Sequence, residues 1–210
     1  MKDRFQLLDQ KLLYREMRKS HGGEELRWVL THEVLHDRET AETFERSLLR
    51  HPGVSAIVPI TEAGEIMMIE QYRYSAQRRL WEIPAGMLRG EFRDGRMVAL
   101  ETPEEAAARE LSEEAGLKAG RLRLVQQFYT MPGTSDGLVY LFLAFNLTRK
   151  TSPADLGEVV IRTEPFTIDR LMSMIASGEI CDAKTILGIY SARNYQEQRH
   201  ETAKQTGDSK

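Results

Sequence analysis

The stretch ETPEEAAARELSEEAGL, Glu101–Leu117, carries the clearest helix signals in the chain. Thr102 and Glu105 form a capping box, in which each side chain bonds a backbone N–H of the other residue. Pro103 suits the first helical position, and Gly116 supplies the left-handed residue that ends many helices. The stretch is therefore predicted to be one helix, around which the other elements can be placed.

A helix over residues 102–115 places Glu110, Glu113 and Glu114 on one face, because residues three and four apart are neighbours. Like charges at this spacing destabilise a helix by roughly 0.2–0.5 kcal/mol per pair, and the helix dipole disfavours carboxylates near the C-terminal end. Something positive should compensate, and Mg²⁺ prefers such oxygen ligands. A charged face open to solvent is the other interpretation of this pattern.

The residues around the helix follow a longer spacing. From Gly95 to Leu117 the chain reads G-x5-E-x7-R-E-L-x-E-E-x-G-L. This form resembles the signature of the Nudix hydrolases. The resemblance covers roughly residues 27–190, and three segments are similar to the branch that acts on ADP-ribose and nucleotide sugars: HPGVSAIVPI, EQYRYSAQRRLWEIPAG and SGEICDAKT.

One departure from the family pattern concerns the signature glycine. In the sugar-nucleotide branch this glycine belongs to a Pro-Ala-Gly turn, which in this chain ends at Gly86. Glu101 lies fifteen residues beyond Gly86, so the chain has gained nine residues, roughly LRGEFRDGR, and Gly95 restores the spacing. We expect Gly86 to hold the original backbone position and Gly95 to match by accident.

The fold class is predicted to be α+β, because short β-type segments lie on both sides of the helix. The resemblance implies an α/β/α Nudix sandwich with a mixed sheet and a small N-terminal antiparallel β region. Strands are expected from alternation and β-branched content, and helices from their periodicity. The strands are expected at 27–36, 43–49, 55–61, 65–74, 78–85, 121–130, 138–149 and 158–163, and further helices at 168–177 and 183–195.

The ends of the chain complete the predicted organisation. Phe5, Leu8 and Leu12 lie near helical spacing, so a short amphipathic helix is expected in the first 18 residues. The residues after Gln196 are polar and aperiodic, which predicts a flexible tail. The predicted division is an N-terminal dimerisation region, a Nudix domain and this tail, at residues 1–52, 53–195 and 196–210.

The resemblance also implies a metal site. It assigns Glu110 and Glu114 as metal ligands, with Glu113 nearby and the Ala85 carbonyl as a backbone ligand. Arg109 is expected to orient the glutamates through charge-assisted hydrogen bonds. The expected cofactor is Mg²⁺, with Mn²⁺ as an alternative. A surface ion pair with a neighbouring glutamate is the other interpretation of Arg109.

A general base is expected outside the ligands, because a metal holds down the pKa of a carboxylate that it binds. In similar enzymes a glutamate on a loop after the later strands has this role. Glu158 is the first choice, Asp155 the second and Glu113 the third; the first two are equally compatible with solvated loop acids.

The implied activity is Mg²⁺-dependent hydrolysis of ADP-ribose to AMP and ribose 5-phosphate. The expected substrate-binding residues are Arg73, Arg79, Glu82, Trp28 and Pro132, the last because a proline about sixteen residues past the signature marks the ADP-ribose group. The other interpretation is a salt-bridge pair on the strand surface for the charged residues and structural packing for Trp28. A GDP-mannose or UDP-glucose pyrophosphatase is the alternative within the branch. A sensor that binds ADP-ribose without hydrolysing it is disfavoured, because all three glutamates are present.

Composition narrows the partners. The net charge of −3 provides no general attraction to nucleic acid or anionic membrane. The single cysteine, Cys181, excludes an internal disulfide and a cysteine-based zinc site. The charged start of the chain is not expected to act as a signal peptide, and no apolar run approaches the roughly 20 residues of a membrane span. We therefore expect a cytoplasmic enzyme for a small nucleotide sugar, and the family resemblance implies a homodimer.

Overall fold

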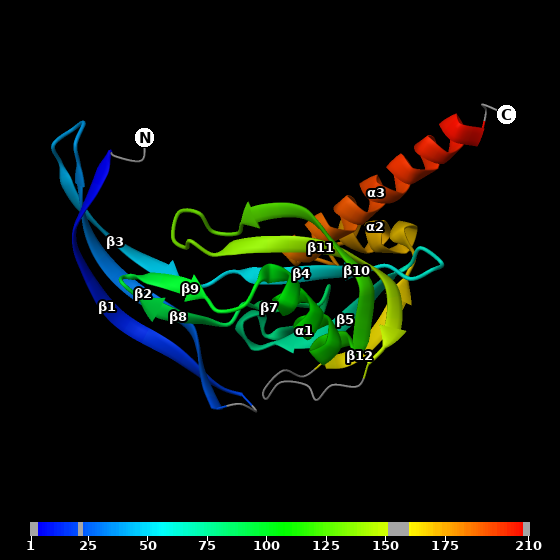
Figure 1. Ribbon diagram of the computed structural model, residues 1–210, viewed down its shortest axis with the longest axis horizontal. Coiled ribbons are helices and arrows are strands. Elements are labelled where there is room, and N and C mark those ends of the chain that lie inside the picture. Colours follow the sequence, from blue (N-terminus) through cyan, green and yellow to red (C-terminus); the bar gives the residue numbers. More distant parts are fainter. Residues whose placement is uncertain (1–3, 21–22, 151–159, 208–210) are drawn as a thin grey trace. The chain divides into compact units, whose positions relative to one another are not determined.

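The computed structural model describes residues 4–20, 23–150 and 160–207 of the chain (Figure 1). The described chain divides into two compact units whose segments alternate along the sequence. Unit 1 comprises residues 1–54, 87–106 and 127–139, and unit 2 comprises residues 55–86, 107–126 and 140–210. Each unit is made of three separate segments of the chain. The predicted division into contiguous regions, at residues 52/53 and 195/196, stays a prediction.

Unit 1 contains an antiparallel sheet and a small hairpin. The sheet has the order β1-β2-β3, and the hairpin pairs β8 with β9. These strands are β1 (Phe5–Ser20), β2 (Gly23–Asp37), β3 (Thr43–Arg50), β8 (Gly90–Arg93) and β9 (Arg96–Ala99). The predicted antiparallel N-terminal region is present, with strands close to the expected residues 27–36 and 43–49.

The prediction of an N-terminal helix is wrong, because β1 occupies these residues as a long strand. Its pairing with β2 shifts register between Leu7 and Asp9 and again between Leu12 and Tyr14. Each such bulge inserts one residue and moves the following side chains to the other face. The alternation of apolar and polar residues is therefore interrupted twice, which produced an apparent helical spacing.

Most of the remaining elements belong wholly or mainly to unit 2. One mixed sheet has the order β10-β11-β4-β7 and a second sheet the order β12-β5-β6. The strands are β4 (Val54–Pro59), β5 (Ile66–Arg73), β6 (Arg78–Glu82), β7 (Ala85–Met87), β10 (Leu117–Tyr129), β11 (Leu138–Arg149) and β12 (Val160–Phe166). The helices are α1 (Pro103–Ala115), α2 (Ile168–Ala176), α3 (Ala183–Gly207) and the 3-10 turn η1 (Tyr74–Ala76). The α+β fold class is confirmed.

Helices α1 and α3 cover opposite faces of the four-stranded sheet. Ala107 and Leu111 of α1 pack against Ile57 and Phe142. On α3, a side chain at Gly188 would lie 3.0 Å from a methyl group of Val58, so this helix contacts the other face of β4. Successive strand residues point to opposite faces, which places the sheet between the two helices. The full burial of β4 from Ser55 to Pro59 agrees with a strand covered on both sides.

The signals that predicted α1 are present in the structure. Thr102 Oγ1 accepts from the Glu105 N–H at 3.2 Å, and a Glu105 carboxylate oxygen accepts from the Thr102 N–H at 2.8 Å. Gly116, with a φ of 64°, follows the helix in the left-handed region. The capping box and the glycine therefore set the two ends of the helix that carries the glutamates.

The predicted loss of regular structure from Gln196 is wrong, because α3 continues to Gly207. Gln196 donates to the Gly64 carbonyl at 2.9 Å, and Arg193 pairs with Glu197 one turn further along. Polar residues such as Gln, Glu, Arg and Lys are good helix formers, so aperiodic polarity did not imply disorder. Among the helices of the described residues, none is long and apolar enough to cross a membrane.

Candidate active site

Two of the three predicted ligand side chains of α1 are buried. Glu110 and Glu114 each retain 5% exposure, and Glu113 is half-buried beside them. An ionised carboxylate is rarely buried unless cations or hydrogen-bond donors surround it. The interpretation of this face as an ordinary solvated helix surface is therefore excluded for Glu110 and Glu114.

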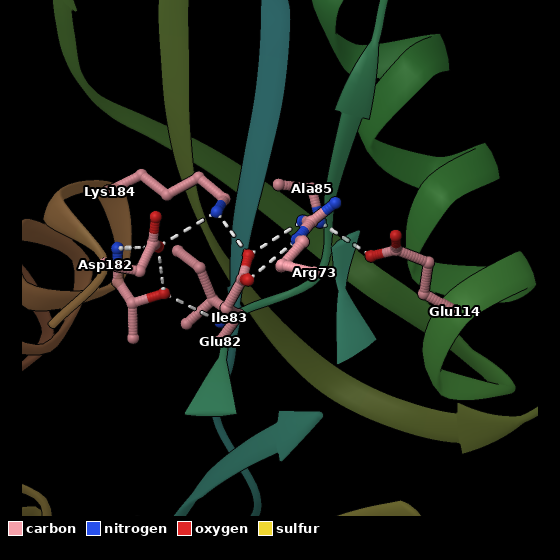
Figure 2. Close-up of polar contacts among 8 residues, drawn as sticks. Arg73, Glu82, Ile83, Ala85, Glu114, Asp182 and Lys184 are labelled. Carbon is pink, nitrogen blue, oxygen red and sulfur yellow. Dashed lines mark hydrogen bonds and ion pairs between the residues drawn. The ribbon is translucent and has the colours of Figure 1, made fainter. Parts of the chain in front are cut away.

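Both buried glutamates contact the turn that joins β6 to β7. The Ala85 N–H donates to Glu114 Oε2 at 2.8 Å, which is drawn at the right of Figure 2. A Cβ atom at Gly86 would lie 1.9 Å from Glu110 Oε1, so the carboxylate occupies the space where a side chain would begin. Any side chain at this position would displace the Glu110 carboxylate, and Gly86 therefore has the close contact expected of the signature glycine.

Gly95 has a different role. It follows Asp94 in the turn between β8 and β9, and the two residues have φ values of 75° and 51°. Positive φ at both central residues is typical of a type I′ turn, for which Asp-Gly is a favoured pair. Much of the inserted segment thus forms a hairpin, and the spacing from Gly95 to Glu101 does not place Gly95 at the glutamates.

Arg109 bonds two of the glutamates. Its Nη1 donates to Glu110 Oε1 at 2.6 Å and to Glu113 Oε2 at 3.1 Å. Only 16% of the Arg109 side chain is exposed, so these charge-assisted bonds are shielded from solvent. The arginine can therefore fix the orientation of both carboxylates, while its role in catalysis stays a prediction.

The donor set fits a divalent cation chemically. The three carboxylates and the Ala85 carbonyl are all oxygen donors, which hard cations such as Mg²⁺ prefer. Within the described residues, no three acidic, histidine or cysteine side chains already converge as a metal centre. Arg109 holds Glu110 and Glu113, and the Ala85 N–H holds Glu114. A cation would therefore have to compete with these bonds for the carboxylate oxygens.

Arg73 and Glu82, predicted to bind substrate, form a bidentate ion pair with each other. Arg73 Nε and Nη2 donate to the two carboxylate oxygens of Glu82, both at 2.8 Å. Lys184 Nζ reaches the same carboxylate at 2.5 Å (Figure 2). Burial alone would raise the pKa of Glu82, but Arg73 and Lys184 outweigh it and hold this pKa below its ordinary value. Glu82 is thus a charged, buried group with two cationic partners.

The other predicted residues are distributed over both units. Arg79 is exposed on β6, where its backbone lies opposite that of Tyr72 on β5. In unit 1, the Trp28 ring lies 5.6 Å from the ring of Tyr14, and the exposed Pro132 belongs to a turn closed by the Thr134 N–H and the Met131 carbonyl. The base candidates Glu158 and Asp155 lie outside the described residues. Only Arg73 and Glu82 of the predicted substrate-binding set are therefore seen in contact.

Three residues of α3 and the segment before it were missed by the sequence reasoning. Asp182, Lys184 and Thr185 lie in the segment SGEICDAKT, which had served only to identify the branch. Asp182 accepts from the Thr185 N–H at 3.0 Å, which is the bond of a helix N-cap. An Asp followed by a helical segment is a recognisable cap signal, but no local pattern indicates that Lys184 contacts Glu82, 102 residues away.

One groove in the described part of unit 2 does not coincide with these residues. It has a volume of about 500 Å³, and its lining includes Ile60, Phe145, Tyr195 and Arg199 but none of the glutamates of α1. Phe145 lies on the opposite face of β11 from Ala144, which packs against α1. Buried carboxylates are the more specific indication of chemistry, so α1 carries the candidate active site.

Comparisons with known proteins agree with this geometry. A family model described as the NUDIX domain matches residues 49–186. The chain is 35% identical over 147 residues to an ADP-ribose pyrophosphatase of Bacillus subtilis (strain 168), covering 69% of this chain and 74% of that protein. It is also 35% identical over 150 residues to a methanol dehydrogenase activator of Bacillus methanolicus, covering 70% and 76%.

A solved structure shows the same fold. The crystal structure of an ADP compounds hydrolase matches with a TM-score of 0.73 and 16% identity, covering 94% of this chain and 96% of that chain. The family match extends from the end of β3 into α3 and includes the glutamates and the Pro84–Gly86 turn. Nudix hydrolases generally use divalent metal ions, in agreement with the oxygen donors described above. The chain belongs to the NUDIX family and is a Nudix pyrophosphohydrolase.

Proposed function

We propose that this enzyme hydrolyses ADP-ribose to AMP and ribose 5-phosphate in a Mg²⁺-dependent reaction. The observation that carries the proposal is the burial of Glu110 and Glu114 against the Ala85–Gly86 turn. The similarity to an ADP-ribose pyrophosphatase over 69% of the chain supports the choice of substrate.

The residues of the site are proposed to have separate roles in metal binding, orientation and proton transfer. Glu110, Glu113, Glu114 and the Ala85 carbonyl hold the ion, which when bound supplies charge neutralisation at the diphosphate and an acidified water. Arg109 keeps two of these carboxylates oriented through its bonds. The proposed base is Glu158, because a ligating carboxylate is a weak base. Asp155 is the second candidate and Glu113 the third.

Substrate recognition is proposed to involve five residues. Arg73 and Arg79 bind phosphate or ribose oxygens, Glu82 accepts hydrogen bonds from the substrate, and Trp28 and Pro132 contribute at the nucleotide. For Arg73 this requires that it exchange at least part of its bond to Glu82, whose second cationic partner, Lys184, keeps the buried charge compensated.

The enzyme is further proposed to be a homodimer formed through its N-terminal region. On β1, large apolar side chains are exposed to solvent: Phe5, Leu7, Leu8, Leu13 and Met17. Contiguous exposed apolar surface is typical of protein interfaces. Light scattering on the purified protein should give twice the chain mass, and the monomer mass would contradict this part of the proposal.

The decisive experiment compares substrates and one variant. Purified enzyme is assayed with ADP-ribose, GDP-mannose and UDP-glucose, with and without Mg²⁺, and kcat/KM is compared. We expect ADP-ribose to give the highest value, AMP to appear as a product, and activity to be lost with a chelator. A higher kcat/KM for GDP-mannose or UDP-glucose would instead identify the alternative function.

The variant Glu114→Gln should abolish turnover while leaving the thermal transition within a few degrees of the wild type, because the amide keeps the shape but not the charge. Glu104→Gln is the matched control, since this exposed glutamate lies on the first turn of the same helix. Full activity of Glu114→Gln would rule out a role for this carboxylate in the reaction.

A further inference from the structure

The first turn of α3 is built around a single carboxylate. Asp182 accepts from the Thr185 N–H at 3.0 Å, from Thr185 Oγ1 at 2.6 Å and from Lys184 Nζ at 2.9 Å. The Ile186 N–H bonds the Asp182 carbonyl, so Asp182 caps the helix. These bonds fix the side chains of Lys184 and Thr185 relative to α3. Both side chains also contact the neighbouring strand.

Both side chains then hold consecutive residues at the end of β6. Thr185 Oγ1 accepts from the Ile83 N–H at 3.0 Å, and both residues have no solvent exposure. Lys184 Nζ contacts the buried carboxylate of Glu82. Figure 2 shows the two contacts side by side, between the start of α3 and the strand. The helix thus fixes one backbone group and one side chain immediately before the Pro84–Gly86 turn.

The same short segment contacts the glutamates of α1 on its other side. Ala85, two residues after Ile83, donates its N–H to Glu114, and Gly86 lies against the Glu110 carboxylate. Only Pro84 separates Ile83 from Ala85. A displacement of Ile83 would therefore also displace the backbone of Ala85 and Gly86, which contacts both glutamates. Proline has a restricted φ, so it absorbs little of such a displacement.

We propose that the first turn of α3 is a positioning element of the active site, in which Thr185 acts through Ile83, and Lys184 through Glu82, to hold the Pro84–Gly86 turn against Glu110 and Glu114. The inference rests on the proposed function, because the property it sets is the affinity of these glutamates for Mg²⁺. It also assigns a physical role to the segment SGEICDAKT.

Apolar packing alone does not provide this control. Gly188 already brings α3 close to Ile83, since a Cβ there would lie 2.9 Å from the end of the Ile83 side chain. Such packing is not directional, whereas the bond from the Ile83 N–H fixes the orientation of the peptide group. Without the Thr185 hydroxyl the buried N–H would lack this partner, and the backbone would shift towards another acceptor.

The test uses Thr185→Val, which keeps the shape and removes the hydroxyl. Mg²⁺ binding is measured by calorimetry without substrate, and kcat and KM are measured with ADP-ribose. Mutation of a residue that orients metal ligands typically costs about 10–100-fold in affinity or activity, and we expect a loss in this range in both readouts. The thermal midpoint should fall by about 5 °C, because one buried N–H loses its acceptor. Thr185→Ser should restore all three values.

Ser191→Ala is the matched control. Ser191 lies two turns further along α3, and its hydroxyl donates to the Leu187 carbonyl of the same helix. Its removal should change neither the affinity for Mg²⁺ nor kcat. If Thr185→Val does not fold, Lys184→Met removes the bonds of Nζ to Glu82 and Asp182 and should weaken Mg²⁺ binding. Lys184→Arg retains the charge and should restore it, and wild-type Mg²⁺ affinity in Lys184→Met would overturn the inference.

The outcomes separate the inference from the proposed function. Wild-type affinity for Mg²⁺ and wild-type kcat in a destabilised Thr185→Val would overturn the inference and leave the function intact. A wild-type protein that binds Mg²⁺ but does not cleave ADP-ribose would refute the function, while weaker Mg²⁺ binding by Thr185→Val would still support the inference. Absence of Mg²⁺ binding by the wild type would overturn both.

Discussion

At the scale of single residues, Gly86 shows how a backbone position becomes part of a site. The Glu110 carboxylate lies where the Cβ of any other residue would stand, so the absence of a side chain lets helix and turn come together. The sequence offered both Gly86 and Gly95, and the Pro-Ala-Gly turn favoured Gly86. The choice depends on which glycine meets the glutamate, and that is a contact between residues 24 positions apart rather than a local pattern.

The variant Gly86→Ala should therefore lower activity as well as stability. The new methyl group would overlap Glu110 Oε1 at 1.9 Å, which forces the carboxylate away from the turn. We expect kcat to fall by about 10–100-fold and the free energy of unfolding by about 1–3 kcal/mol. Both are measured on the same preparation, by steady-state kinetics and by urea denaturation.

Gly120→Ala provides a comparison with milder steric strain elsewhere. Its Cβ would lie 3.0 Å from the Cβ of Asn146, so it should lower stability without displacing a glutamate. If both variants lost the same fraction of activity, strain in general rather than the contact to Glu110 would be the cause.

At the scale of elements, success and failure of the sequence reasoning have a common physical basis. Helix α1 was predicted correctly because its cap residues and its periodicity are local, and both ends have the expected hydrogen bonds or φ values. Strand β1 was mistaken for a helix because two bulges interrupt its alternation, and bulges are defined by the partner strand. Local sequence signals are enough to predict an element such as α1. An element such as β1, whose pattern depends on its pairing with a distant segment, cannot be predicted from them.

The capping box of α1 leads to a prediction about stability. Removing the hydroxyl in Thr102→Ala leaves the Glu105 N–H without its side-chain acceptor, which should lower the free energy of unfolding by about 1 kcal/mol. The thermal midpoint should fall by about 2–4 °C, measured by calorimetry. Thr102→Ser keeps the hydroxyl and should remain within one degree of the wild type; an equal loss in both variants would exclude the cap as the cause.

At the scale of the whole molecule, buried and shielded ion pairs make the fold sensitive to acid. Arg4 holds the pKa of Asp37 at about 2 through two nitrogen atoms that bond its carboxylate. Glu82 also has a lowered pKa, with Arg73 and Lys184 outweighing the effect of burial. These long-range pairs were invisible in the sequence, because no local spacing links their members.

A carboxylate whose pKa is lower in the folded state stabilises the fold above its unfolded pKa, which is about 3.9 for Asp. That stabilisation is lost as the pH falls through the folded pKa. Asp37→Asn should therefore lower the thermal midpoint at pH 7, and its difference from the wild type should narrow between about pH 5 and 2. Thermal scans across this range provide the measurement, and a constant difference down to pH 2.5 would contradict the assignment.

The hairpin β8–β9 has a consequence for how relatives of this enzyme are recognised. Its strands pair from Gly90 with Ala99 to Arg93 with Arg96, and the Leu100 N–H bonds the Arg89 carbonyl. The chain thus leaves and returns at neighbouring points, so this excursion can lengthen or shorten by whole pairs of residues at little cost to its surroundings. A sequence search that requires a fixed number of residues between the Pro-Ala-Gly turn and the acidic helix would overlook genuine family members. A search that allows a hairpin of variable length at this point would find them.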